Sequence, residues 1–344
     1  MRIAIVTTSY PVQAEDPSGH FVRAEARARC GQGDAVHVIA PDSARRPSDL
    51  DPSIRVWPVP HLGLFGWPGA AARIRARPWT ALGAVPFCAH AAERLQRIRP
   101  ELVIAHWLVP SAMPVAACGT RAPLVAVAHG ADIRLLLAVP APVRIWCLAH
   151  IAERATRIRF AASSSLDQLC LALPDELARQ LRDKATVELP PIELPDVTVQ
   201  AAALRRSVPC DRLVVLVARL VASKRVELAI DAMQFLPSKT RLHVIGDGPT
   251  RASLLQRDRL HRVTFAGTLP RKRTLAWIAA ADVLIHTSGA EAAPTVVREA
   301  RMLGTPVVAC DAGDVARWAA VDPGIVVALP QVPALVDALR LLLR

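Results

Sequence analysis

The sequence predicts an α/β protein built from two doubly wound domains, each with a parallel sheet. Short β-branched runs alternate with longer Ala- and Leu-rich segments at helical spacing, and this alternation occurs twice along the 344 residues. A proline-punctuated stretch at residues 188–195 separates the two halves, and a helix cannot continue through it. We therefore expect an amino-terminal domain at 1–195 and a carboxyl-terminal domain at 196–344, each long enough for its own core.

Twelve apolar runs flanked by helical segments are typical of buried parallel strands. In open parallel sheets, ligands lie beyond the carboxyl ends of the strands, so the residues that follow each run are the candidates for chemistry. The expected strands are 2–8, 35–40, 55–59, 102–106, 124–128 and 158–162 in the first half, and 213–217, 241–245, 262–266, 282–286, 306–309 and 324–328 in the second.

Two basic residues follow the first strand of the second half. Arg219 and Lys224 lie five residues apart on the expected loop. A planar guanidinium and a compact ammonium in this arrangement can converge on one doubly charged group, such as a diphosphate. Only four of the 42 basic residues are Lys, so a lysine here carries more information than an arginine. The alternative is a pair of solvated loop charges.

A helix is expected after the fourth strand of the second half. Pro294 suits its first turn, and Gly304 followed by Pro306 predicts its end after about ten residues. The exposed amides of Thr295 and Val296, together with the positive end of the helix dipole, are suited to bind a phosphate.

Two carboxylates accompany this helix. Glu299, within it, is placed to accept hydrogen bonds from a ribose diol, and Glu291, in the preceding loop, can meet sugar hydroxyls. The alternative is that Glu299 pairs with Arg298 or Arg301 on a solvated face and that Glu291 is an ordinary loop charge.

Taken together, these elements resemble the signature of the family 4 retaining glycosyltransferases (group 1 glycosyltransferases), which have the GT-B fold. Glu291 and Glu299 are separated by seven residues, as in that signature. Arg219 and Lys224 match the family's phosphate-binding loop. Two further segments look like its intervening strand-turn units, at 244–249 and 263–267.

The resemblance implies two domains facing across a cleft and retaining transfer of a hexosyl group from a nucleotide diphosphate sugar. It implies that Thr268 and Leu269 line the base pocket through their backbone. The chain departs from the family at 292–294, where Ala-Ala-Pro replaces Gly-Phe-Gly, and at Arg225, where glycine is common. The last expected helix, 332–344, belongs to the second domain, whereas the family's last helix usually braces the first.

The first half contains three further matches to the family. Gly19, in the loop after the first strand, allows the backbone to approach the donor phosphate; a plain turn before a helix is the alternative. His129, in a His-Gly-Ala-Asp element, is expected to contact the transferred sugar, unless it is a histidine bound to a backbone carbonyl. For His106 that structural alternative is favoured. His129 and Glu291 are thus the expected catalytic residues.

Composition indicates which binding partners and which cellular compartment to expect. A net charge of +12 favours polyanionic partners. A general bias of this chain toward Arg accounts for the charge equally well. Because the arginines are dispersed, nucleic acid is disfavoured. The seven scattered cysteines include no C-x-x-C pair, which fits a reducing cytoplasm. The first apolar run is too short for a signal peptide, and no run reaches the roughly 18 residues of a membrane span.

We expect neither a metal nor a cofactor. The Asp-Leu-Asp element at Asp49 and Asp51 is remote from the donor elements and is interpreted as a turn. Arg219, Lys224 and the helix amides would then neutralise the leaving nucleotide of a UDP- or GDP-sugar. Two alternative functions remain: a sugar-nucleotide epimerase of the same fold, and a non-catalytic basic scaffold that binds membrane or nucleic acid. A dinucleotide-binding dehydrogenase is excluded because no G-x-G-x-x-G follows the first strand.

Residues 62–100 interleave aromatic and basic side chains, as does Arg144-Ile-Trp146. Such segments are suited to a lipid headgroup interface. We expect peripheral contact with an anionic membrane surface, at the inner face of the plasma membrane, where a glycan or lipid-linked sugar would be the acceptor. Amphipathic packing with an Arg bias is the alternative. The side chains concerned are Phe65, Trp67, Arg73, Arg75, Arg77 and Trp79.

Overall fold

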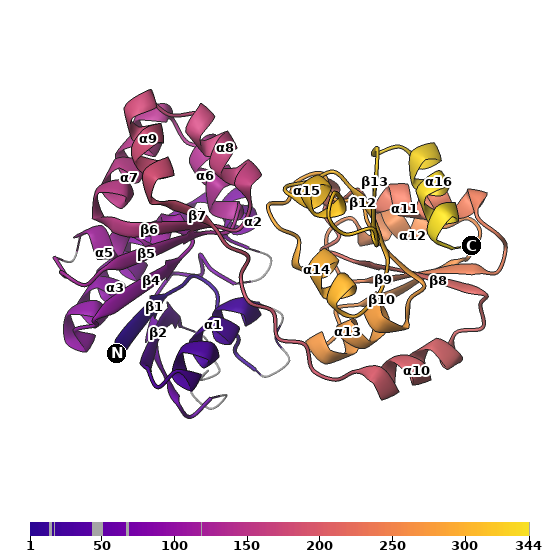
Figure 1. Cartoon of the computed structure of the whole chain (residues 1–344), viewed down its shortest axis with the longest axis horizontal. Helices are drawn as coiled ribbons and strands as arrows, with labels where there is room; N and C mark the ends of the chain where they lie inside the picture. The colour runs from indigo at the N-terminus through magenta and orange to yellow at the C-terminus, as the bar shows by residue number, and fades with distance from the viewer. Residues whose placement is uncertain (14–15, 17, 43–50, 67–68, 118, 344) are drawn as a thin grey trace. The chain divides into compact units, whose positions relative to one another are not determined.

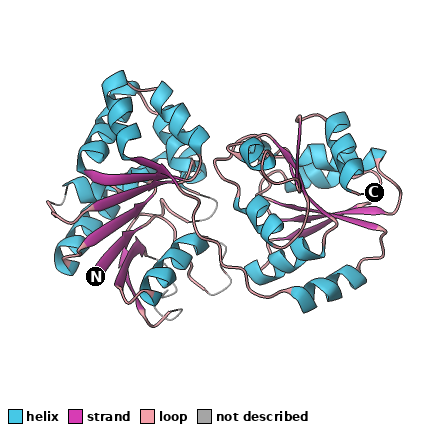
Figure 2. Cartoon of the chain, viewed as in Figure 1, coloured by secondary structure: helices cyan, strands magenta, loops and turns pink. Residues whose placement is uncertain are grey.

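A computed structural model describes the chain except for residues 14–15, 17, 43–50, 67–68, 118 and 344. It contains two compact units, Met1–Glu193 and Leu194–Arg344. Each unit is a parallel sheet with helices on both faces (Figures 1 and 2). Among the described residues, no helix combines the length and the hydropathy that crossing a membrane requires.

The first unit has a seven-stranded sheet in the order β3-β2-β1-β4-β5-β6-β7. All of its strand pairs are parallel. The strands are β1 (Arg2–Val6), β2 (Ala35–Pro41), β3 (Ile54–Val59), β4 (Leu102–His106), β5 (Leu124–Ala128), β6 (Ala155–Phe160) and β7 (Ala185–Val187). The helical segments are α1 (His20–Gly31), α2 (Ala70–Ala76), η2 (Pro78–Gly83), α3 (Ala84–Ile98), α4 (Leu108–Ser111), α5 (Met113–Ala117), α6 (Ala131–Ala138), α7 (Ala141–Arg154), α8 (Ser163–Leu171) and α9 (Asp175–Lys184).

Alternation of side chains along β1 explains why this sheet is covered on both faces. Ile3 and Ile5 belong to the core cluster that includes Val22 of α1. Ala4 and Val6 belong to the opposite cluster, which is built from α3, α7, α8 and α9. Because successive side chains of a strand point to opposite faces, an uninterrupted apolar run buries both. Each fully buried Ile contributes about 1.5–3 kcal/mol of transfer free energy.

The second unit has a six-stranded sheet in the order β10-β9-β8-β11-β12-β13, again with parallel pairs. The strands are β8 (Arg212–Val217), β9 (Thr240–Ile245), β10 (Val263–Gly267), β11 (Val283–His286), β12 (Val307–Cys310) and β13 (Ile325–Ala328). The helical segments are α10 (Thr198–Ser207), η3 (Ala222–Lys224), α11 (Val226–Ala232), η4 (Met233–Phe235), α12 (Arg251–Arg257), α13 (Arg271–Ala280), α14 (Thr295–Met302), α15 (Val315–Ala319) and α16 (Val332–Leu342).

The same alternation organises the second unit. Val214 and Leu216 of β8 face the cluster that contains α11 and α16. Leu213 and Val215 face the cluster formed with α10, α13 and α14. Helix α16 therefore packs within this unit, through Leu335, Leu339 and their neighbours.

The expected strands match the observed ones closely, with two corrections in the first unit. Strand β6 begins at Ala155, three residues before the expected start, and ends before residues 161–162, which lead into α8. Its first half was not recognised because exposed Thr156 and Arg157 interrupt the apolar pattern. Strand β7 was missed because it is a three-residue edge strand that contributes no apolar run.

The strand order places one switch point in each sheet. In the first unit the order reverses between β1 and β4, and in the second between β8 and β11. Ligands of doubly wound proteins bind beyond the carboxyl ends of the strands at such a point. The loops that follow these four strands are therefore the places where each unit can bind a ligand.

Candidate functional site

In the second unit, hydrogen bonds connect the loops that follow β8 and β11. The amide of Gly289 donates to the carbonyl of Ser223 at 2.9 Å, and Oγ1 of Thr287 donates to the carbonyl of Lys224 at 2.8 Å. Arg225 takes the position where the family often has glycine, and its φ of 48° lies in the left-handed region. Its Nε donates to the carbonyl of Thr287 at 2.9 Å, so this departure adds a third link between the loops.

Lys224 and Glu291 form an ion pair between these two loops. Behind the pair, Nε2 of the buried His286 lies 3.8 Å from the Glu291 carboxylate. Burial raises the pKa of Glu291, but Lys224, His286 and Ser288 together outweigh burial, and the net pKa is lowered. Burial lowers the pKa of His286 to about 4. At neutral pH the site therefore contains a cation, a carboxylate and a neutral imidazole.

The loop that carries Arg219 is packed against the loop after β9. Gly246 has a φ of 130°, and a Cβ there would lie 1.9 Å from the carbonyl oxygen of Ala218. A Cβ on Gly248 would lie 2.3 Å from the carbonyl oxygen of Leu220. Only glycine permits these two approaches. The side chain of Arg219 itself is exposed, on the same loop as Lys224.

Helix α14 begins at Thr295, with Pro294 as its N-cap residue. The helix is eight residues long, shorter than the expected ten or so, and Pro294 precedes the first turn instead of occupying it. No side chain within the described chain caps this end, so the first amides, including those of Thr295 and Val296, are available to an anion. The preceding loop is held where the amide of Asp314 donates to the carbonyl of Ala292 at 3.1 Å.

Glu299 is buried and pairs with Arg271, the first residue of α13, at 2.5 Å. The alternative of a pair on a solvated face is wrong, because Glu299 is only 6% exposed; Arg301 pairs with Asp322 at 2.9 Å. Sequence analysis missed Arg271, which lies 28 positions before Glu299 in the chain.

The expected base-binding residues precede Arg271 directly. Thr268 is exposed, while Leu269 is half-buried against the core of this unit. The preceding Gly267 has a φ of 68°, so it turns the chain sharply after β10. The loop with Thr268 and Leu269 thus leads straight into the arginine that contacts Glu299.

In the first unit, Gly19 is the N-cap residue of α1 and has a φ of 67°. A Cβ at this position would lie 2.4 Å from the carbonyl oxygen of Ser9. The glycine is thus required where the loop after β1 folds back onto itself at the start of α1. That close approach accounts for the glycine without a ligand.

His129 and His106 form a pair at the ends of β5 and β4. Nδ1 of His106 lies 3.0 Å from Nε2 of His129, and the two rings are inclined by only 13°. Nε2 of His106 lies 3.4 Å from Glu25 of α1, and Arg159 of β6 donates to the same carboxylate at 2.7 Å. Within the described residues neither ring is bound by a backbone carbonyl; each ring contacts the other, and His106 is buried, as a structural histidine would be.

Asp132 explains how the backbone of His129 is held. One carboxylate oxygen accepts from the amide of His129 at 3.0 Å, and the other accepts from the amide of Leu108 at 2.7 Å. Burial raises the pKa of Asp132, with these backbone bonds acting against it. The His-Gly-Ala-Asp element therefore orients the imidazole through the backbone and leaves the ring to contact His106.

A signal in the sequence points to Glu25 and Arg159. Glu25 lies on the buried stripe of α1 with Val22 and Ala26, and Arg159 interrupts a parallel strand. A charge at a position that the periodicity buries requires a partner, because a lone buried charge is costly.

Asp51 has a structural role, in agreement with its interpretation as a turn residue. It accepts from Nε of Arg23 at 2.5 Å and lies 3.6 Å from Nε of Arg27. Asp49 lies outside the described residues. Where the structure describes the chain, no three His, Cys, Asp or Glu side chains are arranged to hold a metal ion.

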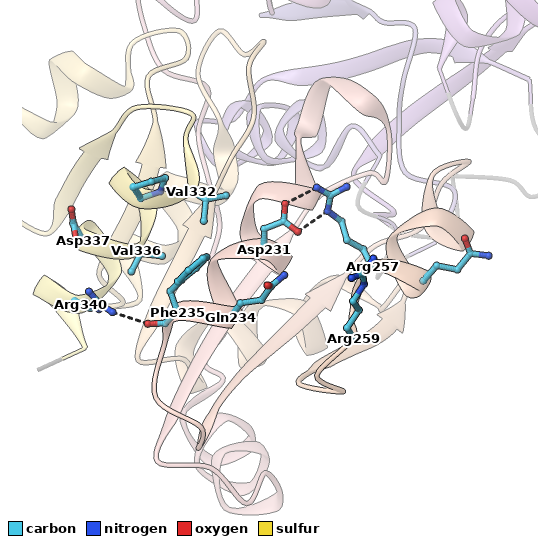
Figure 3. A pocket seen from close by; sticks show the side chains of 11 residues that line it. Asp231, Gln234, Phe235, Arg257, Arg259, Val332, Val336, Asp337 and Arg340 are labelled. Atoms are coloured by element: carbon cyan, nitrogen blue, oxygen red, sulfur yellow. Dashed lines mark hydrogen bonds and ion pairs between the residues drawn. The ribbon is translucent and has the colours of Figure 1, made fainter.

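A separate groove of about 730 Å³ lies on the second unit, between η4, α12 and α16 (Figure 3). Arg257 forms a bidentate pair with Asp231 at 2.6 and 2.7 Å across it. Arg340 donates to the carbonyl of Phe235 at 2.8 Å. None of the expected donor-binding residues lines this groove, so we place the candidate site at the β8/β11 switch point.

Two parallel α/β units, with a cationic loop and an uncapped helix at the switch point of the second, define the GT-B architecture. Solved structures agree. The chain matches sucrose-phosphate synthase from Thermosynechococcus elongatus with a TM-score of 0.75 at 19% identity, over 99% of this chain and 89% of that one. Anabaena HepE in complex with UDP-glucose matches with a TM-score of 0.70 at 19% identity, over the same shares. These likenesses show the fold.

Residues 211–344 match the model of the family described as glycosyl transferases group 1. TuaC of Bacillus subtilis, named for glycosyl transfer in teichuronic acid biosynthesis, is 28% identical over 232 residues, 63% of this chain and 54% of that protein. The sulfoquinovosyl transferase SQD2 of Arabidopsis thaliana is 28% identical over 177 residues, 50% of this chain and 34% of that protein. The chain thus spans about half or less of these relatives.

Proposed function

We propose that the chain is a retaining glycosyltransferase that moves a hexosyl group from a nucleotide diphosphate sugar to an acceptor hydroxyl. One observation carries this proposal. The loops after β8 and β11 are joined so that Lys224 and Glu291 meet at the switch point, in the same unit as the uncapped start of α14. Fixed cations and helix amides are what a departing diphosphate requires.

The donor is assigned from the chemistry of the second unit. Arg219, Lys224 and the amides of Thr295 and Val296 would bind the diphosphate, and Glu299 would accept from the ribose. Among the structural relatives, HepE has been solved with UDP-glucose, which favours UDP over GDP as the nucleotide. Because the charge on the leaving group is neutralised by the protein itself, we propose transfer without a divalent metal.

The proposed transfer breaks the bond between the anomeric carbon and the diphosphate oxygen, and the acceptor oxygen bonds to that carbon on the same face. The acceptor proton passes to a phosphate oxygen of the leaving group, so no dedicated nucleophile is needed. Glu291 and His129 would orient the sugar hydroxyls while positive charge develops on the ring. The name of TuaC favours a glycan or a lipid-linked sugar as acceptor.

Nucleotide binding is the direct test. In a thermal-shift panel of UDP, GDP, ADP and TDP, we expect one nucleotide to stabilise the protein, because a ligand at about 100 times its Kd adds roughly 2.7 kcal/mol. The shift should persist with EDTA present and should be lost in Lys224→Ala. The control is Lys239→Ala, a lysine whose side chain is 72% exposed and 3.6 Å from Asp211.

If no nucleoside diphosphate shifts the melting temperature, the donor site does not exist as described. The epimerase alternative is tested by NMR of the donor incubated without acceptor: a new sugar epimer would support it. A non-catalytic scaffold would show neither a nucleotide-dependent shift nor turnover.

A surface of the first unit supports the proposed membrane partner. Residues 52–92 contain no Asp or Glu. Within this stretch the side chains of Leu62, Trp79, Leu82 and Val85 are each more than 60% exposed. Their segments lie together, since Gly83 packs on the carbonyl of residue 61 and Arg73 donates to the carbonyl of Gly63 at 2.7 Å. Arg75 and Arg77 are exposed in the same segment.

The second segment expected at a membrane, Arg144-Ile-Trp146, gives weaker support for the membrane partner. Nη2 of Arg144 donates to the carbonyl of Ala172 at 3.0 Å, and its Nη1 donates to Val139 at 3.3 Å, so this guanidinium already has partners within the protein. Trp146 nevertheless remains exposed. Trp67, from the first segment, lies outside the described residues.

Vesicle co-sedimentation tests the membrane partner. We expect binding to vesicles with anionic lipid at low salt and weaker binding to neutral vesicles. At about 1 kcal/mol per basic residue, Arg75→Gln with Arg77→Gln should weaken binding roughly 30-fold. The control exchanges two other exposed arginines, Arg121 and Arg206, for Gln. An equal loss of vesicle binding in both double variants, or no vesicle binding by the wild-type protein, would show that the apolar and basic surface does not bind membranes.

A further inference from the structure

A chain of four polar side chains runs through the core of the first unit to the imidazole of His129. It begins at Arg159 of β6 and continues through Glu25 of α1 and His106 of β4. The exposed fraction is 6% for Glu25 and 1% for His106. Four separate elements thus contribute one side chain each, so the arrangement is set by the fold and not by a local turn.

The carboxylate of Glu25 is ionised in this setting. Burial alone would raise its pKa, but the contacts with His106 and then with Arg159 outweigh burial and lower the pKa to about 2. Glu188 lies 4.0 Å from Arg159 and adds a second, more exposed carboxylate. An ionised carboxylate can only accept hydrogen bonds, so it requires a proton on the nitrogen that faces it.

For a neutral His106, that requirement determines the protons on both rings. The nitrogen of His106 that faces Glu25 is Nε2. In a neutral His106, a proton on Nε2 leaves Nδ1 as an acceptor, and Nδ1 faces Nε2 of His129. His129 must then donate from Nε2, which leaves its own Nδ1 without a proton. Within the described part of the chain, no hydrogen bond is made to that Nδ1.

We propose that Glu25 is a positioning residue: it holds a proton on Nε2 of His106 and thereby makes Nδ1 of His129 a hydrogen-bond acceptor. The inference rests on the proposed function for its consequence, since the acceptor would receive a hydroxyl proton of the transferred sugar. Burial is the largest cause that keeps the pKa of His129 well below its ordinary value, with the Glu25 charge acting against it, so the ring of His129 stays neutral. Asp132 contacts the backbone and leaves the rings to this chain.

The protons can be observed without any substrate. Long-range ¹H–¹⁵N correlation spectra of the full chain, labelled at histidine, distinguish protonated from bare ring nitrogens. At neutral pH we expect Nε2 of His129 to be protonated and its Nδ1 bare. The reverse pattern in the wild-type protein would overturn the proposal at once, whatever the variants do.

Glu25→Gln tests the cause. A glutamine of nearly the same shape can donate as well as accept, so it no longer specifies which nitrogen of His106 carries the proton. We expect mixed tautomers at His129 in this variant. The matched control is Glu176→Gln, on the exposed face of α9, where the carboxylate contacts Arg179 at 2.6 Å. An unchanged His129 spectrum in Glu25→Gln would refute the role of Glu25.

Turnover separates positioning from simple packing. With the tautomers mixed, kcat/KM for the donor should fall about 10-fold, the scale of one hydrogen bond to the sugar, while the affinity for free nucleoside diphosphate stays unchanged. A change of tautomer without a loss of turnover would refute the catalytic consequence. If the wild-type chain transferred no sugar at all, the proposed function would fail while the spectra still decided the proton positions.

Discussion

Replacing Lys224 by Ala is expected to lower turnover by about 10²-fold or more, and Arg219→Ala by a similar factor. In the proposed reaction both cations stabilise negative charge that grows on the diphosphate as the sugar leaves. That charge is larger in the transition state than in the bound donor, so the loss should appear mainly in kcat. Steady-state kinetics with the nucleotide sugar chosen by thermal shift would measure it.

The ion pair between Lys224 and Glu291 complicates Lys224→Ala, because the variant leaves a partly buried carboxylate without its partner. Lys224→Gln retains a hydrogen-bond donor and removes only the charge, so both variants should be slow if charge is what matters. The controls are Lys239→Ala and Arg206→Ala, two exposed residues of the same unit. Wild-type kinetics in both Lys224 variants and in Arg219→Ala would show that these two residues do not form a diphosphate site.

Glu299→Gln is expected to weaken nucleotide binding by about 10- to 100-fold, the range for a hydrogen bond to a charged group. The proposed cause is the loss of an anionic acceptor for the two ribose hydroxyls. This cause has a specific signature: wild-type protein should prefer UDP over 2′,3′-dideoxy-UDP, and the variant should have lost most of that preference. Calorimetric titration with both ligands would measure the difference.

Because Glu299 is buried against Arg271, a general disturbance of the unit has to be distinguished from a lost ribose contact. Asp322→Asn is the matched control, since it breaks an ion pair that Arg301 of α14 makes at 2.9 Å. It should leave both affinities unchanged. If Glu299→Gln retained the full preference for the ribose ligand, Glu299 would be a structural partner of Arg271 and no more.

Much of the fold was predictable because both sheets are parallel and buried on both faces. The continuous apolar runs that become β1, β4, β5 and β8 follow directly from that burial. The failures have the same origin: β7 is a short edge strand, and β6 starts with exposed polar residues. Neither requires an apolar run, so periodicity could not detect them.

The candidate site was predicted unevenly. Lys224, Glu291 and Glu299 were recognised from residue type and spacing, and the structure shows Lys224 and Glu291 in contact. The partners that hold them were not recognised: Arg271 binds Glu299, and Arg225 joins the two loops from a left-handed position where the family often has glycine.

By itself, the sequence determined the two parallel α/β domains and the residues that follow their strands, because hydrophobic periodicity and strand-exit positions are local properties of the chain. Only the tertiary structure decided which side chains meet. The chain from Arg159 through Glu25 and His106 to His129 joins residues up to 134 positions apart. Such contacts depend on strand order and on which face of a sheet a helix covers, and pairwise electrostatics then sets the protons on each ring.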